Sequence, residues 1–127
     1  MIIKITGNEF LNMCDAFSRL ILKEMHLNTA CTIAKNIKEM DTIKKVIEEK
    51  RNDIVKEYAQ KDSDGNIIVK NDGNIEGITD IEKFNSKLYD LLSQEIEINI
   101  SKISKTDLKD ITISPMDILS LEKCLEE

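Results

Sequence analysis

The stretch TACTIAKNIKEMDTIKKVIEEKRNDIVKEYAQ, residues 29–60, decides the fold class of this chain. Its apolar residues recur every seven positions, at Ile33, Met40, Ile47 and Ile54. The companion heptad positions hold Ala30, Ile37, Lys44, Arg51 and Tyr58. This spacing predicts one long helix with a coiled-coil-like seam. At 1.5 Å per residue the helix is about 45–50 Å long, more than a small domain covers, so we expect part of it to project or to pair with a second chain.

We predict an interaction surface on this helix, made of its heptad line and two inner basic residues: Ile33, Met40, Lys44, Ile47, Arg51 and Ile54. A buried, unpaired Lys44 or Arg51 would cost several kcal/mol, so each must reach water or meet an acid such as Glu48 or Asp41. A homodimer through the helix would supply those acids from the other chain. The alternative is that this segment faces solvent.

Before the long helix, the β-branched residues 2–5 predict a short strand. Thr6 and Glu9 have the spacing of a capping box, which predicts a helix over residues 7–26. Asn28 is the expected N-cap of the long helix. His26 then falls at the end of the first helix, where a positive charge would be favoured by the helix dipole.

After the long helix, turn residues and two β-branched runs predict a hairpin over residues 61–78, with its tip at 71–74. A helix is expected over 80–95, with Phe84 and Leu88 buried on its apolar face. The period then changes to two, which predicts a strand over 96–103. Ser114 and Pro115 predict the start of a helix over 115–126. The chain is therefore predicted to be one α+β domain, 1–127, dominated by helices with a small, mainly antiparallel sheet.

The charge is unevenly placed along the sequence. Residues 1–61 hold 11 basic and 9 acidic residues, whereas residues 62–127 hold 7 and 15, for a formal net charge of −6. The acidic half would repel a phosphate backbone, so we expect no direct binding of nucleic acid. It would suit a basic protein partner. No run approaches the roughly 18 apolar residues of a membrane span, so we expect no membrane association. The odd number and wide spacing of the three cysteines predict reduced thiols and a cytoplasmic location.

We predict no catalytic residue, no cofactor and no metal site, and hence a protein that is not an enzyme. The three cysteines are widely spaced, and Cys14 and Cys31 fall among apolar positions. His26 is the single histidine. The segment Asp62-Ser63-Asp64-Gly65 resembles the middle of a calcium loop but lacks the ligands at both ends, so a turn is expected there.

Five short motifs carry a resemblance that spans most of the chain. They are Ala34-Lys35-Asn36-Ile37, the turn at residues 61–66, Phe84-Asn85 with Leu91-Leu92, the run at residues 95–98, and Ile113-Ser114-Pro115-Met116-Asp117. The chain resembles short uncharacterised proteins of phages and prophages of low-GC Gram-positive bacteria. The resemblance implies no functional residue, because that family has no established activity.

Together these observations favour a phage or prophage protein that acts through protein–protein contacts, as an assembly or accessory factor. The alternative is an acidic inhibitor of a host defence protein that mimics nucleic acid. A small enzyme that uses Cys124 or clustered acids is the third hypothesis.

Overall fold

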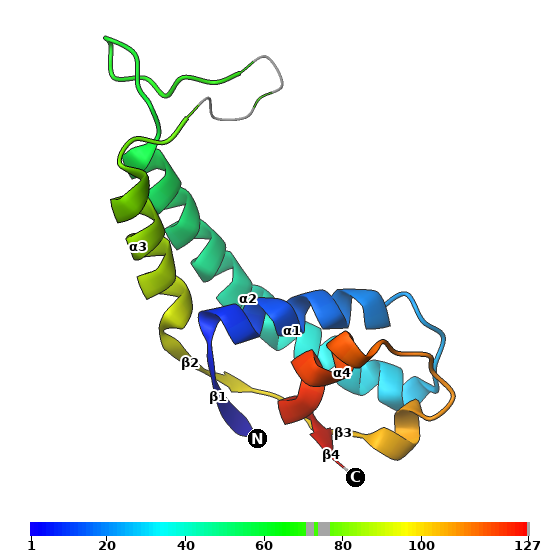
Figure 1. The fold of residues 1–127 in the computed structure, drawn as a ribbon. Helices are drawn as coiled ribbons and strands as arrows, with labels where there is room; N and C mark the ends of the chain where they lie inside the picture. Colours follow the sequence, from blue (N-terminus) through cyan, green and yellow to red (C-terminus); the bar gives the residue numbers. More distant parts are fainter. Residues whose placement is uncertain (71–72, 74–76, 127) are drawn as a thin grey trace. The chain divides into compact units, whose positions relative to one another are not determined.

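The computed structural model describes residues 1–70, 73 and 77–126, and it has the helix-dominated α+β fold that the sequence predicts (Figure 1). In chain order the elements are β1 (Ile2–Thr6), α1 (Gly7–Leu20), α2 (Leu27–Tyr58), α3 (Ile81–Ser93), β2 (Glu95–Asn99), β3 (Ile103–Ser104), the 3₁₀ helix η1 (Lys105–Leu108), α4 (Pro115–Leu121), the 3₁₀ helix η2 (Glu122–Cys124) and β4 (Leu125–Glu126). These elements form two compact units. Unit 1 is Met1–Lys44 with Glu95–Glu127, and unit 2 is Lys45–Gln94.

The sheet of unit 1 joins the first residues of the chain to the segment that follows unit 2. β1 pairs antiparallel with β2, and Ile3 lies opposite Ile98 on the buried face. On the other face Lys4 lies opposite Glu97, and their charged groups approach to 3.7 Å. The alternation of apolar and polar residues in the sequence therefore places one face of each strand in the core. A second, parallel pair of two residues each joins β3 to β4.

α1 begins as predicted and ends earlier. The Thr6 side chain accepts from the Glu9 N–H, and the Glu9 carboxylate accepts from the Thr6 N–H, which is the predicted capping box. The helix buries Phe10, Met13, Phe17 and Leu20 and ends at Leu20 instead of residue 26. A turn in which the N–H of residue 23 donates to the Leu20 carbonyl closes it.

α2 runs from Leu27 to Tyr58, so the prediction of Asn28 as its N-cap is wrong. The Ala30 N–H donates to the carbonyl of His26 at 2.9 Å, which makes His26 the residue before the first turn. His26 therefore lies at the positive N-terminal pole of α2 and not at the negative end of α1. The favourable interaction with a helix dipole that the sequence suggested is absent.

A buried asparagine ties α2 to the segment between β2 and β3. Asn36 is fully buried, its amide nitrogen donates to the Ser101 carbonyl at 2.9 Å, and its oxygen accepts from the Ser101 N–H at 2.8 Å. Both backbone groups of Ser101 are thus satisfied by one side chain. Asn36 also shares a helix face with the buried Ile33 and Met40, because residues three and four apart lie on the same side.

The C-terminal segment closes unit 1. Ser114 caps α4 by accepting from the Asp117 N–H, and Pro115 occupies the first turn, as predicted. The helix ends at Leu121, and the rest of the predicted helix over 115–126 is η2 and β4. In those last residues Cys124 and Leu125 are buried. The chain leaves the helix because β4 pairs with β3 instead.

Unit 2 contains residues 45–58 of α2 together with α3. The rings of Tyr58 and Phe84 meet edge to face with centroids 6.1 Å apart. The Lys87 ammonium bonds to the Glu57 carboxylate at 3.0 Å and lies 5.6 Å from the centre of the Tyr58 ring. α3 contains no buried residue, so the prediction that Phe84 and Leu88 are buried is wrong. Both are half-exposed.

The predicted hairpin over 61–78 falls partly outside the described residues, as does most of its predicted tip at 71–74. The described part has a tight turn at residues 62–66, where Gly65 takes a φ of +84°. Isolated antiparallel bridges join Lys61 to Ile67 and Ala59 to Ile78.

Candidate functional site

The structure places the six residues of the predicted interaction surface in different environments. Ile33, Met40 and Ile47 are buried, with exposed fractions of 3%, 3% and 6%. Lys44, Arg51 and Ile54 are half-exposed. The heptad line is also divided, because residues up to Lys44 belong to unit 1 and the others to unit 2. A second chain that docks on this structure can therefore reach only the three half-exposed residues.

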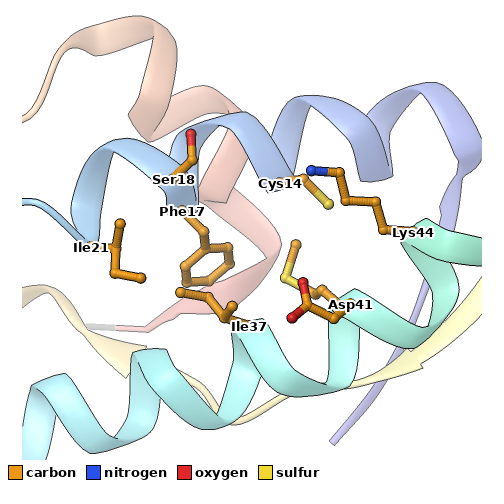
Figure 2. Close-up of a pocket in the computed structure, with 8 residues that line it drawn as sticks. Cys14, Phe17, Ser18, Ile21, Ile37, Asp41 and Lys44 are labelled. Atoms are coloured by element: carbon orange, nitrogen blue, oxygen red, sulfur yellow. The ribbon is translucent and has the colours of Figure 1, made fainter. Parts of the chain in front are cut away.

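A groove between α1 and α2 in unit 1 includes two of the six predicted residues, Met40 and Lys44. Figure 2 shows Phe17 of α1 and Ile21, the residue after α1, facing Ile37 of α2 across it. The complete lining is Cys14, Phe17, Ser18, Ile21, Ile37, Met40, Asp41 and Lys44. Its volume is about 160 Å³. Sites for drug-sized ligands have about 300–1,000 Å³, whereas a cavity of about 150 Å³ binds one benzene molecule. The groove therefore suits one apolar side chain.

The rim of the groove carries two opposite charges on one helix. Asp41 and Lys44 are three residues apart on α2, so they lie on the same side of that helix. In Figure 2 the Lys44 side chain extends toward Cys14 on α1. Asp41 is exposed and Lys44 half-exposed, so both charged groups are accessible to a partner.

Apolar surface continues beyond the groove at the end of α1. Ile21 is 61% exposed and the next residue, Leu22, is 85% exposed. The predicted helix over residues 7–26 includes both positions. The early end of α1 at Leu20 brings both side chains to the surface instead.

The three cysteines have different environments. Cys124 is fully buried, its Sγ lies 3.5 Å from the Met13 Sδ, and desolvation raises the pKa of its thiol to about 11. A thiol with that pKa is almost entirely protonated at neutral pH and is a poor nucleophile. Cys31 is exposed on α2, and Cys14 is half-buried in the groove.

The loop that resembles a calcium site is a turn held by its own first aspartate. The Asp62 carboxylate accepts from the Asp64 N–H at 2.9 Å and from the Asn66 N–H at 3.0 Å. Within residues 1–70, 73 and 77–126, no group of three or more histidine, cysteine or acidic side chains is arranged to hold a metal ion.

Sequence reasoning missed two polar residues that organise unit 1, Asn36 and Arg19. Asn36 occupies a buried position between Ile33 and Met40, and its place in an otherwise apolar helix face was the available signal. Arg19 bonds to Asp117 on α4, and no sequence pattern links residues so far apart.

Comparisons of the chain with family models, with curated proteins and with solved structures yield no match. Among the helices that the structure describes, none combines the length and the apolar character needed to cross a bilayer.

Proposed function

We propose that this protein acts through protein–protein contacts, as a non-enzymatic assembly or accessory factor of a phage or prophage, and that its first partner is a second copy of the same chain. The observation that carries the proposal is the groove between α1 and α2, with its apolar floor and its two opposite charges. The resemblance of the sequence to short phage and prophage proteins supports the biological setting.

The charges at the rim favour a second copy as the partner. In a two-fold symmetric contact, residue i of one chain meets residue j of the other, and j meets i. A two-fold axis between Asp41 and Lys44 pairs each of them with its opposite charge on the other copy. The half-exposed Ile37 lies on the same helix one turn before Asp41, so apolar contact accompanies the two ion pairs.

A charge-swap experiment tests this contact. Light scattering at tens of micromolar is expected to give twice the 14.5 kDa mass of one chain. Lys44→Asp sets like charges against each other and is expected to give monomers. The double variant Asp41→Lys with Lys44→Asp restores opposite charges across the axis and is expected to recover the dimer. Lys38→Asp, on an exposed position of α2 outside the groove, is the matched control.

Two results would contradict the proposal. A mass of one chain for the unmodified protein would rule out self-association. A double variant that is as monomeric as Lys44→Asp would show that Asp41 and Lys44 do not pair across a two-fold axis.

The alternative, an acidic inhibitor that mimics nucleic acid, has weaker support. It rests on the acidic surplus of residues 62–127. In the fold the acidic residues are divided between the two units. Unit 2 has 8 basic and 11 acidic residues, and unit 1 has 10 basic and 13 acidic residues. Neither unit concentrates the surplus. Salt-sensitive binding to a basic nuclease, with loss of affinity as the salt concentration rises, would favour this alternative.

A further inference from the structure

The N-terminal turn of α2 presents backbone donors that the helix itself does not use. Because the first bond of the helix runs from the Ala30 N–H to the His26 carbonyl, the N–H groups of Leu27, Asn28 and Thr29 have no acceptor within the helix. No acidic side chain lies in this first turn. The partial positive charge at the N-terminus of this 32-residue helix is therefore not neutralised by an acidic side chain of the first turn.

A polar cavity of about 330 Å³ lies against this turn. The α2 end of the cavity is formed by His26, Asn28, Thr29 and Thr32. Lys102 and Asp107, from the segment that includes η1, line the other side. All these residues belong to unit 1. The cavity is twice as large as the groove between α1 and α2, and it reaches the size range of ligand sites.

The hydroxyl of Thr29 points to a ligand in this cavity. Thr29 is only 6% exposed, and no residue that the structure describes forms a hydrogen bond with its hydroxyl. In the described part of the chain every fully buried polar side-chain atom has a partner. The Thr29 hydroxyl must therefore retain contact with open space, and the space that Thr29 lines is this cavity. The hydroxyl of this nearly buried residue is therefore available to form a hydrogen bond with a group in the cavity.

Lys102 is held in place on the other side of the cavity. Its neighbour Ser101 is fixed by both hydrogen bonds of Asn36, and Asn36 lies two turns after Thr29 on the same face of α2. The backbone that carries Lys102 is thus attached to the helix whose first turn forms the site. Among the residues that line the cavity, Asp107 is the one carboxylate, and it is exposed to water.

We infer that the first turn of α2, the Thr29 hydroxyl and Lys102 bind a phosphate group, either inorganic phosphate or the phosphate of a small monoester. Free N–H groups at a helix N-terminus, one hydroxyl and one ammonium are the donors that bind phosphate oxygens in proteins. The acidic net charge of the chain does not oppose this, because the donors are local and Asp107 is the single opposing charge that lines the cavity. This site is independent of the contact proposed above.

The test is a titration followed by the backbone amide signals in ¹⁵N-resolved NMR, at constant ionic strength. Inorganic phosphate and methyl phosphate are titrated separately, with sodium chloride as the blank. We expect saturable shifts at Asn28 and Thr29 with a Kd on the order of 1 mM or tighter for at least one of them. Binding of inorganic phosphate alone identifies the free ion as the ligand, and tighter binding of methyl phosphate identifies a monoester.

Four variants separate the site from general attraction to surface lysines. Lys102→Met is expected to weaken binding about tenfold or more, because it removes a charge-assisted bond. Lys105→Met, an exposed lysine of η1 that does not line the cavity, is the matched control and leaves the affinity unchanged. Thr29→Val weakens binding with little change of shape, and Asp107→Asn strengthens it. The spectrum of each variant shows that it is folded.

Two outcomes would overturn the inference. One is shifts that grow without saturation or that match the chloride blank. The other is an equal loss of affinity in Lys102→Met and Lys105→Met.

Discussion

Arg19 on α1 and Asp117 on α4 form a bidentate ion pair, although they lie 98 positions apart in the chain. The Arg19 Nε is 2.9 Å from each carboxylate oxygen of Asp117, and a terminal guanidinium nitrogen contacts one of them as well. The Asp117 side chain is only 7% exposed, and Arg19 compensates its charge at this buried position. The pair attaches the C-terminal helix to α1 in unit 1.

This pair predicts how stability depends on pH. The hydrogen bonds from Arg19 lower the pKa of Asp117 below its ordinary value, so the folded state favours the carboxylate. The stabilisation is present above the unfolded pKa of about 3.9 and is lost as the pH falls through the lower folded pKa. Asp117→Asn is therefore expected to reduce the loss of thermal stability below about pH 4.

A double-variant comparison is the control for this prediction. In an Arg19→Gln background, Asp117→Asn should change the pH dependence less than it does in the unmodified chain. Some acid sensitivity should remain in every variant, because the Thr6 N–H lowers the pKa of Glu9 as well. Equal pH dependence of unfolding in the unmodified chain and in Asp117→Asn would contradict the prediction.

Removal of the Asn36 side chain is expected to destabilise unit 1 strongly. Asn36→Ala leaves the N–H and the carbonyl of Ser101 without their partners at a partly buried position, at up to about 1–3 kcal/mol for each group. Chemical denaturation measures the change in the free energy of unfolding. Asn52→Ala, at an exposed position of the same helix, is the matched control and should change it by less than about 0.5 kcal/mol. Equal effects of the two substitutions would show that Asn36 does not anchor Ser101.

Leucines in the two units are expected to differ in their contribution to stability. Leu121 is fully buried in unit 1, so Leu121→Ala should lower the free energy of unfolding by about 2–5 kcal/mol. Leu88 in α3 is half-exposed, so Leu88→Ala should lower it by about 1 kcal/mol. Urea denaturation of both variants checks the order. A larger effect at Leu88 would mean that its face of α3 is covered by another chain in solution.

Burial of Cys124 predicts a large difference in thiol reactivity. Its pKa of about 11 leaves roughly one thiolate in a thousand at pH 8, and the side chain is inaccessible. The exposed Cys31 should react first with an aromatic disulfide reagent. In a Cys14→Ser, Cys31→Ser variant, Cys124 should react at a rate set by unfolding and independent of the reagent concentration. A rate that rises in proportion to the reagent would show that Cys124 is accessible in the folded chain.

The parts of the fold that local rules govern were predictable from the sequence. The capping box of Thr6 and Glu9, the cap at Ser114 and the heptad period of α2 each depend on residues within a few turns of one another. The end of α1, the pairing of β1 with β2 and the change from helix to β4 depend on residues far away in the chain. The spacing of apolar residues within a segment gives no information about such contacts, so these features were missed or misplaced.

The candidate site was predictable only in part, for the same reason. Heptad spacing identified Met40 and Lys44, which line the groove. It also selected Ile33 and Ile47, which the fold buries. Spacing along a helix shows which residues share a face but not which face the rest of the chain covers. The heptad spacing of α2 gives no information about the half of the groove that Cys14, Phe17 and Ser18 of α1 provide.

Unit 1 is formed by two segments of the chain, Met1–Lys44 and Glu95–Glu127, which the ribosome makes at different times. Its first strand is made at the start, but the partner strand follows only after the 50 residues of unit 2. About 90 residues separate β1 from β2. At about 5–20 residues per second, β1 therefore waits about 5–18 s for β2 to be made, plus the time needed to leave the ribosome. We expect nascent chains arrested before residue 95 to contain the α2–α3 hairpin and a protease-sensitive N-terminal segment. Limited proteolysis of the arrested chains measures the protection of the N-terminal segment. Chains arrested after residue 127 and a linker are the control. Full protection of the shorter chains would contradict the expectation.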